Sequence, residues 1–575
     1  MALGPGSSYE TVSNGRRPVT ASRLGWIELL CLAWIVSVPL VEAFRGVDLT
    51  DTGFLLSNQY WILHDPSAAS YWFHLWLTNL IGGLVLLAAG PVGLFASKLA
   101  SAFLFWGLVW AAFRLYGKHA DARWIWIGAA VTLAFDFAGK VNVVHYNNLS
   151  VLFFAWMAVF LTEGTASRRA SLYAAAGAVF VANVLIRLPN AVGVVLLTVP
   201  FLMDWLTPKE TAKWKLGWRF PAAFVVGAAL TALTAASAMF LLRHAHWYLE
   251  SLSALGRESL GDPGTHYGPL RVIGRPIKAA LLCLASGAVL AGVVWLVGFL
   301  LTRSRKAMLW AIAVGLAAAI PAVLFVHDLR AFVAPLIGAV YLGLLAVFNR
   351  KSSPSPRLVL ASIFSGGVVF LLSWGSDTGI AVATYALPLA LPGLLLWAGE
   401  EWPWAQTGRL ALISVAAVYG AWSLATVVYR DQPTGTATIQ VSGVGPVLTT
   451  PERARAIESM AAEISRFSRP GDTVLIAHSL PLLHYLTRTK PYLGNPWPAL
   501  LTPRQLKTEL AERETTSLPV VTVLAKANAR GAYWPEGLGS DVGELEILDF
   551  LTRNQFVKAA ETPYGRFYIR KKEGP

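Results

Sequence analysis

Apolar runs of eighteen residues or more recur along this chain between residues 24 and 429, and they constrain its fold more than any other feature. One helical crossing of a bilayer takes about 20 apolar residues. Of the 575 residues, 55% are hydrophobic and only 14% are charged. A soluble chain of this length would show amphipathic periodicity in several domains instead. The sequence therefore predicts a polytopic α-helical membrane protein.

The apolar runs predict thirteen transmembrane helices. One further apolar stretch, residues 70–89 (SYWFHLWLTNLIGGLVLLAA), is interpreted as a helix lying along the outer membrane surface. Counting it as a crossing would place Lys118, Arg123, Arg168 and Arg169 outside, against the positive-inside rule. The predicted spans are 24–44, 93–115, 123–140, 147–163, 170–187, 190–206, 219–242, 277–302, 307–326, 331–349, 357–374, 380–398 and 408–429.

This odd number of spans sets the expected organisation. Residues 1–23 form a cytoplasmic tail, residues 24–429 a transmembrane domain whose first outer loop is 45–92, and residues 430–575 an extracytoplasmic domain. The first span is expected to be retained rather than cleaved as a signal peptide. The expected location is the bacterial inner, or cytoplasmic, membrane.

The net charge of +14 does not point to nucleic acid as a partner. In a membrane protein, Lys and Arg mark cytoplasmic loops and bind anionic membrane lipids. The two cysteines, Cys31 and Cys283, both lie in apolar spans. They offer neither a disulfide framework nor a thiolate metal site.

Residues 430–575 differ from the preceding chain in composition. An amphipathic stretch, ERARAIESMAAEISRF, is followed by a Pro-Gly-Asp turn at 470–472 and by three strand-like stretches, TVLIAH, PVVTVLAK and GRFYIRKK. This alternation predicts a small α/β domain. It contains no Walker loop and no dinucleotide-binding fingerprint.

Polar residues gather at the predicted outer ends of the helices. Basic residues should be rare there, so those present call for an anionic ligand, and Arg binds phosphate in bidentate fashion. A carboxylate beside such a site can act as a general base. The candidate catalytic residues are Asp51 and Asp48, and the candidate substrate- or phosphate-binding residues are Arg187, Arg330, Arg257, His145, Asn148, His266, Tyr267 and His327.

Two stretches carry a resemblance to a known family. DTGFLLSNQYWIL, at residues 51–63, is similar to the first outer loop of GT-C superfamily glycosyltransferases, which include protein O-mannosyltransferases and lipid A aminoarabinose transferases. HDLRAFVAPLIGAVYLGLL, from residue 327, is similar to their outer turn before a Pro-containing helix. The expected architecture, about thirteen helices and an outer C-terminal domain, also resembles several members.

The resemblance implies transfer of a sugar, with inversion, from a polyprenyl-phosphate donor to a glycan, lipid or protein acceptor at the outer membrane face. Asp51 stands in the D-x-G-F position of the catalytic base, and Arg330 matches the phosphate-binding turn. The residue after Asp51 is Thr52 rather than an acid. The sequence does not require a divalent metal, although Asp48, His145 and Asn148 could supply ligands to Mg²⁺ or Mn²⁺.

Structural roles remain open for each candidate. Asp48 and Asp51 are suited to turns and helix caps, and His145 and Asn148 to capping the helix that follows. Arg187 is suited to reaching the membrane interface, and Arg330 to pairing with Asp328. His266 and Tyr267 lie in a Gly/Pro-rich loop that could be a lid over the site or only a connection. At the level of the whole protein, the alternatives are a polysaccharide polymerase of the O-antigen type, a transporter of lipid-linked sugars, or a non-catalytic receptor.

Overall fold

The structure is a computed structural model. It describes residues 25–117, 122–206, 216–261, 276–289, 356–374, 379–401, 405–536 and 543–571, with isolated positions between some of these ranges. The predicted span 307–326, and nearly all of 331–349, lie outside the described residues.

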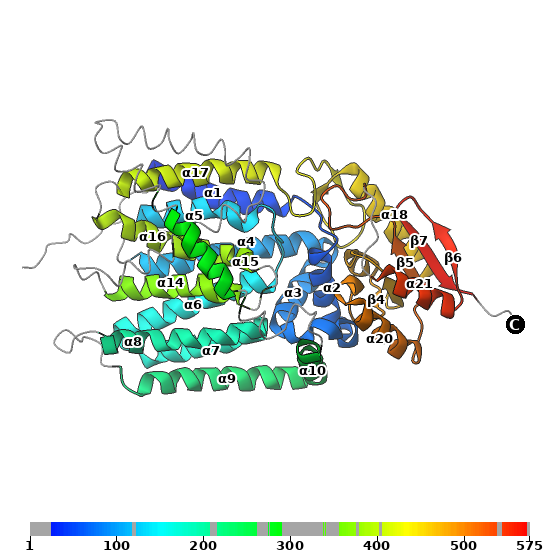
Figure 1. Ribbon diagram of the computed structural model, residues 1–575, viewed down its shortest axis with the longest axis horizontal. Coiled ribbons are helices and arrows are strands. Elements are labelled where there is room, and N and C mark those ends of the chain that lie inside the picture. The colour runs from blue at the N-terminus through cyan, green and yellow to red at the C-terminus, as the bar shows by residue number, and fades with distance from the viewer. Residues whose placement is uncertain are drawn as a thin grey trace, which may run out of the picture.

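Long apolar helices form a bundle that occupies the left and centre of Figure 1. Their apolar side chains face one another and, on the outer helices, the surroundings; Trp26, Leu230 and Phe240 are strongly exposed. The helices are α1 (Trp26–Ala43), α4 (Gly93–Tyr116), α5 (Ala122–Phe137), α6 (Tyr146–Ser167), α7 (Ala170–Ile186), α8 (Thr198–Leu206), α9 (Arg219–Leu241), α14 (Pro356–Ser373), α15 (Ile380–Ala383), α16 (Leu387–Glu401) and α17 (Ala405–Thr426), and the 3₁₀ segments η3 (Leu188–Leu197) and η4 (Thr384–Ala386) join them.

Helical structure covers the described part of each predicted span, so those helix predictions are confirmed at the level of secondary structure. Nearly all of residues 290–302, the second half of the predicted span 277–302, lies outside the described residues. Among the described residues, five helical segments are long and apolar enough to cross a membrane by length and composition. The chain is thus a multi-pass membrane protein. The number thirteen and the orientation of the termini remain predictions.

The predicted first outer loop contains a helix within the expected residues 70–89, and it contains further helix that the sequence did not indicate. Helix α2 (Asp51–His64) begins at Asp51 itself, and η1 (Pro66–Leu75), α3 (Trp76–Ala89) and η2 (Gly90–Val92) follow it. A further helix, α10 (Ala245–Gly261), occupies part of the segment expected to be a loop. Helices α2 and α3 lie at the end of the bundle that faces the C-terminal part of the chain (Figure 1).

The C-terminal part is built on a five-stranded sheet in the order β4-β3-β5-β7-β6. Strands β3 (Thr473–Ile476), β4 (Lys490–Pro491) and β5 (Val521–Ala525) are parallel, whereas β6 (Phe556–Glu561) and β7 (Gly565–Arg570) complete the sheet in antiparallel pairs. A separate pair, β1 (Ala437–Thr438) and β2 (Leu448–Thr449), precedes it. The three predicted strand stretches are confirmed as β3, β5 and β7.

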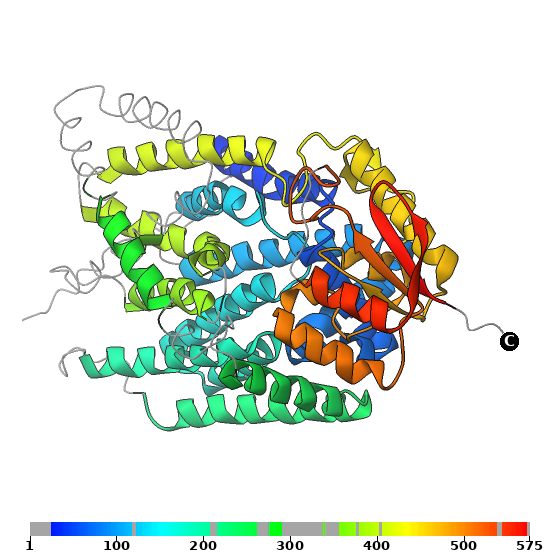
Figure 2. The same ribbon diagram turned by 45° about the vertical axis from the view of Figure 1, so that its right-hand side comes forward.

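Alternating side chains on these strands serve two cores, because successive residues of a strand point to opposite faces. Val474 and Ile476 of β3 pack with α18 (Pro451–Phe467) and α19 (Leu482–Thr487), whereas Leu475 packs with α20 (Pro503–Glu514) and α21 (Glu544–Arg553). Figures 1 and 2 show the sheet between these helix layers, at one end of the bundle.

Capping residues fix the ends of these helices. Thr450 accepts a hydrogen bond from the Arg453 N–H at the start of α18. Thr502 does the same for Gln505 at the start of α20. The short 3₁₀ segment η5 (Pro498–Leu500) precedes this helix. A proline follows each capping threonine, where its missing N–H costs no hydrogen bond. The amphipathic stretch at 451–467 is therefore a helix, as predicted.

Candidate active site

Asp48 organises the start of α2. Its Oδ1 accepts hydrogen bonds from the Thr50 N–H at 3.0 Å and the Thr50 hydroxyl at 2.5 Å, and its Oδ2 accepts from the Thr52 N–H at 2.7 Å. The first N–H groups of a helix have no acceptor within the helix, and the Asp48 carboxylate supplies one for the Thr52 N–H. Asp48 is buried, and both of its oxygens are used. The geometry favours the structural role for Asp48 over a direct chemical one.

Gly53 brings the C-terminal part against α2. A Cβ atom at this position would lie 2.2 Å from the Leu482 backbone nitrogen, so only glycine allows the close approach. The Leu482 N–H donates to the Leu49 carbonyl at 3.0 Å, and the Ser57 hydroxyl donates to the Pro481 carbonyl at 2.9 Å. The glycine of the D-x-G-F stretch is thus explained by contact with a segment more than 400 residues later in the chain.

Asp51 is the first residue of α2, and its side chain is 36% exposed. Its Oδ2 accepts a hydrogen bond from the Tyr429 hydroxyl at 2.5 Å and lies 2.7 Å from Nη1 of Arg430. The positive end of the α2 dipole and the Arg430 charge both favour the ionised carboxylate. Asp51 is therefore a carboxylate that contacts a cation and that a ligand can reach.

Arg430 follows the end of α17 and has a left-handed backbone, with φ of 49°. Such a conformation is strained for a residue other than glycine, and strain of this kind clusters at functional sites. Burial acts to lower the pKa of Arg430, but the Asp51 and Asp48 carboxylates outweigh it and the pKa is raised. Arg430 also donates to the Thr50 hydroxyl, so it contacts two adjacent residues, Thr50 and Asp51, at the N-terminus of α2.

A second arginine approaches from the sheet. Ser479 follows β3 and Arg530 follows β5, and because these strands are parallel their carboxyl ends lie at one edge, the usual ligand-binding edge of such sheets. The Ser479 hydroxyl oxygen accepts from Nε of Arg530 and from Nε1 of Trp497, both at 3.2 Å. The guanidinium carbons of Arg530 and Arg430 lie 5.2 and 5.9 Å from the centroid of the Trp497 indole ring.

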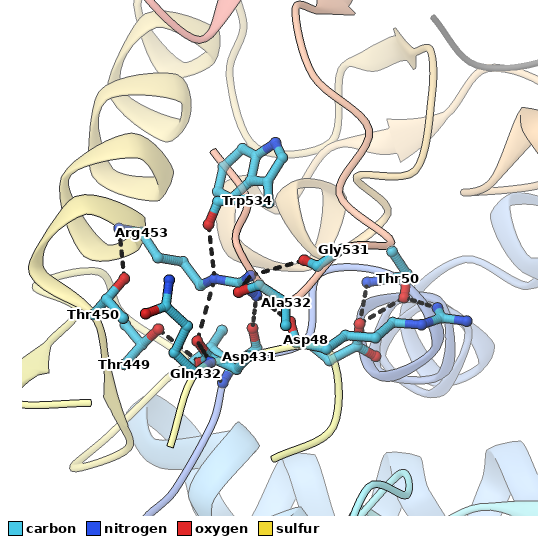
Figure 3. A network of polar contacts seen from close by, with 12 residues as sticks. Asp48, Thr50, Asp431, Gln432, Thr449, Thr450, Arg453, Gly531, Ala532 and Trp534 are labelled. Carbon is cyan, nitrogen blue, oxygen red and sulfur yellow. Dashed lines mark hydrogen bonds and ion pairs between the residues drawn. The ribbon is translucent and has the colours of Figure 1, made fainter. Parts of the chain in front are cut away.

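A buried ion pair ties these segments together (Figure 3). Arg453 and Asp431 both have fully buried side chains, and Nε of Arg453 lies 3.4 Å from Oδ1 of Asp431. The remaining guanidinium hydrogens go to backbone carbonyls, while the Val47 N–H and the Thr449 hydroxyl donate to Oδ2 of Asp431. The carbonyls that accept from Arg453 belong to Val47, Arg430, Gly531, Ala532 and Trp534.

This arrangement makes Arg453 a positioning residue. One guanidinium fixes the backbone just before Asp48, the backbone of Arg430 itself, and the turn that directly follows Arg530. Burial lowers the pKa of Arg453 despite the attraction of Asp431 and Asp48. A buried charge is tolerated only when it is paired and hydrogen-bonded, as here.

The predicted sites His145 and Asn148 are used in capping α6. Nδ1 of His145 accepts from the Asn147 N–H at 3.0 Å and the Asn148 N–H at 3.1 Å, and Nε2 lies 3.0 Å from the Tyr385 hydroxyl. Burial lowers the pKa of His145 to about 4, so the ring is neutral at pH 7. The Asn148 amide bonds to Ser101, Val143 and the His145 N–H. The capping interpretation therefore explains both residues.

Arg187 is likewise bound into the bundle. It is buried, and its Nη1 and Nη2 donate to the carbonyls of Leu372 at 3.1 Å and Trp374 at 3.0 Å, at the end of α14. Its guanidinium also lies 5.7 Å from the Tyr146 ring centroid. A cation at a helix C-terminus stabilises the last carbonyl groups. The described contacts of Arg187 thus support a structural role rather than the predicted phosphate contact.

The structure does not describe the side chains of five predicted site residues. Arg330, His327, His266 and Tyr267 lie outside the described residues, and Arg257 lies on α10, where the structure describes no side chain for it.

No group of three or more His, Cys, Asp or Glu side chains that could hold a metal ion occurs in the part of the chain that the structure describes. The polar atoms of Asp48 bond to the start of α2, whereas those of His145 and Asn148 bond at the start of α6. These three residues therefore do not fit a metal centre. A pocket of about 310 Å³ lies beside Arg45, Gly46 and Leu448, and its lining does not include Asp51.

The sequence interpretation missed Arg430, Trp497, Arg530 and Arg453. A signal for Arg430 existed, because it directly follows the last predicted span at a predicted outer helix end. The other three lie in a domain whose sequence shows no chemical motif. Their proximity to Asp51 depends on how the C-terminal part docks on α2.

The sequence matches no protein-family model and no curated protein. The structure is similar to ArnT from Cupriavidus metallidurans in the apo state, with 15% identity, 95% of this chain and 98% of that chain covered, and a TM-score of 0.39. It is also similar to the oligosaccharyltransferase AglB from Archaeoglobus fulgidus in complex with an inhibitory peptide and a dolichol-phosphate, with 12% identity, 87% and 70% coverage and a TM-score of 0.38.

A structure of the Archaeoglobus fulgidus oligosaccharyltransferase tethered with an acceptor peptide is similar at 11% identity, 95% and 74% coverage and a TM-score of 0.41. These similar proteins are GT-C enzymes, the superfamily that the sequence resembles. With TM-scores below 0.5, the likeness carries no functional conclusion. Any function has to be argued from the residues around Asp51.

Proposed function

We propose that this protein is an inverting glycosyltransferase of the GT-C type. It moves a sugar from a polyprenyl-phosphate donor to a glycan, lipid or protein acceptor at the outer face of the cytoplasmic membrane. The observation that carries the proposal is the pairing of Asp51, an accessible carboxylate at a helix N-terminus, with Arg430 at 2.7 Å. Helix α2, which begins at Asp51, lies between the apolar bundle and the C-terminal part of the chain (Figure 1).

These two groups supply the charges that the reaction needs. The acceptor hydroxyl oxygen forms a bond to the anomeric carbon, and its proton passes to the Asp51 carboxylate. The bond from that carbon to the phosphate oxygen breaks, and its electron pair leaves with the phosphate. A phosphate leaving group needs little protonation, so one carboxylate suffices as the base, and a nearby guanidinium stabilises the developing negative charge.

The roles of the other residues follow from their contacts. Asp48 fixes the start of α2 and so the position of Asp51. Arg453 holds the backbone of Arg430 in place. Tyr429 donates a hydrogen bond to Asp51 and keeps its carboxylate oriented. A contribution of Arg330, His327, His266, Tyr267 or Arg257 to phosphate or acceptor binding remains part of the proposal.

Transfer from a radiolabelled polyprenyl-phosphate sugar, in membranes that contain the protein and its native envelope acceptors, tests this function. Asp51→Asn removes the base while keeping a side chain of nearly the same shape. It should lower the rate at least ~100-fold, the usual contribution of a general base. Asp549→Asn, which changes an exposed aspartate on α21, is the matched control and should leave the rate unchanged.

The same assay separates the alternatives. A transporter would move the labelled lipid across the bilayer without releasing polyprenyl phosphate, and a polymerase of the O-antigen type would require a diphosphate-linked oligosaccharide. Full transfer activity in Asp51→Asn would refute the role of Asp51 as base.

A further inference from the structure

Two arginines that the sequence does not connect lie near one aromatic ring beside Asp51. Arg430 comes from the segment after α17, Arg530 from the turn after β5, and Trp497 from the segment between β4 and α20. Trp497 is buried and packs against Phe54 of α2, with a ring centroid distance of 6.2 Å. The ring therefore connects the first turn of α2 to both guanidinium groups.

Each of these guanidinium groups has N–H donors that its contacts within the described residues do not use. Both polar contacts of the Arg430 side chain use Nη1, and the polar contact of the Arg530 side chain uses Nε. An arginine has five N–H donors. Within the part of the chain that the structure describes, Nη2 and Nε of Arg430, and both Nη atoms of Arg530, have no hydrogen-bond partner in the protein.

The charges around Arg530 are also unbalanced. Arg430 pairs with Asp51, but no carboxylate lies within ion-pair distance of Arg530 among the described residues. Buried Arg453 donates to the carbonyls of Gly531 and Ala532, which fixes the turn after Arg530 (Figure 3). The Arg530 side chain itself is exposed. Two pre-positioned guanidinium groups with spare N–H pairs are suited to bidentate recognition of a phosphate.

We propose that Arg430 and Arg530, aligned by Trp497, form the binding site for a phosphate group of the substrate. Arg430 contacts Asp51 through Nη1 and the phosphate through its remaining N–H groups. The phosphate is thereby placed next to the base. The inference rests on the proposed function for the identity of the substrate, and it assigns to the C-terminal part a direct share in ligand binding.

The phosphate has two sources in such a reaction, the lipid-linked donor or a phosphorylated acceptor. Binding of polyprenyl phosphate, and separately of inorganic phosphate, to the purified full-length protein in lipid nanodiscs distinguishes them, with polyprenol as the probe that lacks phosphate. Neither measurement needs turnover, so the result is independent of the transfer assay.

The variants are Arg430→Gln, Arg530→Gln and the double variant, with Arg504→Gln on α20 as a matched exposed arginine. Hydrogen bonds to a charged group are worth about 1.5–3 kcal/mol. Each single variant should therefore weaken polyprenyl phosphate binding at least ~10-fold. Polyprenol binding in all variants, and phosphate binding in Arg504→Gln, should not change.

The outcomes separate clearly. Weakened binding of both phosphate probes supports the site and identifies the donor as the source. Weakened binding of inorganic phosphate alone supports the site and identifies a phosphorylated acceptor. The variant Arg530→Gln leaves Asp51 and its partners intact. Unchanged binding of both probes in this variant would overturn the inference. If Asp51→Asn still abolishes transfer in that case, the proposed function stands without the phosphate site.

Discussion

Arg187 and Arg430 both follow the end of a long apolar helix, yet their surroundings differ. Arg187 is buried and gives its terminal N–H groups to the carbonyls at the end of α14. Arg430 meets a carboxylate and keeps Nη2 and Nε unused within the described residues. The two arginines differ in burial and in the kind of partner: backbone carbonyls surround Arg187, whereas Arg430 faces an accessible carboxylate. Of the two, Arg430 therefore fits the proposed ligand site better.

Arg453 and Arg530, both in the C-terminal part, also differ in burial and in how many guanidinium nitrogens are hydrogen-bonded. Arg453 is fully buried and uses all three guanidinium nitrogens, whereas Arg530 uses one. We therefore expect substitutions of Arg453 and Arg187 to lower stability, and substitutions of Arg430 and Arg530 to lower ligand affinity.

The largest effect on stability is expected for Arg453→Met. Removing one partner of a buried ion pair leaves an uncompensated charge on Asp431 and several unsatisfied carbonyls, and such changes cost about 3–5 kcal/mol. Thermal unfolding of the detergent-solubilised protein measures the loss. The double variant Arg453→Met/Asp431→Asn should recover part of it.

Arg455→Met is the matched control for this prediction. It lies two residues further along α18, and its side chain is 68% exposed. Its effect should stay within about 0.5 kcal/mol. A similar small effect for Arg453→Met would remove the basis for calling it a positioning residue.

An intermediate loss of stability is expected for Arg187→Met. The methionine fills much of the volume but leaves the Leu372 and Trp374 carbonyls without their donors, at a cost of about 1–3 kcal/mol. The affinity for polyprenyl phosphate should remain that of the wild type. A tenfold weaker affinity with unchanged stability would restore Arg187 as the phosphate ligand that its sequence context suggested.

The smallest effect is expected for His145→Ala, which removes the N-cap of α6. Loss of a cap costs about 1 kcal/mol, and Asn is among the best capping residues. His145→Asn should therefore be close to the wild type in unfolding temperature. If His145→Asn instead abolishes sugar transfer while remaining stable, His145 acts on the substrate as well as on the helix.

Much of the secondary structure could be predicted from the sequence. Apolar runs of sufficient length predict helices because a bilayer leaves backbone groups no other partners. Short runs rich in β-branched and apolar residues predicted β3, β5 and β7. Helix α2 was not predicted, because its stretch DTGFLLSNQYWILH mixes polar and apolar residues. Its polar side chains, Ser57 and Gln59, bond to backbone carbonyls of segments distant in the sequence.

For the candidate site, the sequence by itself determined that an aspartate follows the first apolar helix in a D-x-G-F stretch, and that basic residues stand at the ends of several helices. Only the tertiary structure decided which arginines share a site with that aspartate. The reason is physical: the role of a guanidinium depends on which acceptors surround it. Tyr429 and Arg430, the partners of Asp51, lie more than 370 residues away along the chain, and only the tertiary structure brings them within hydrogen-bond distance.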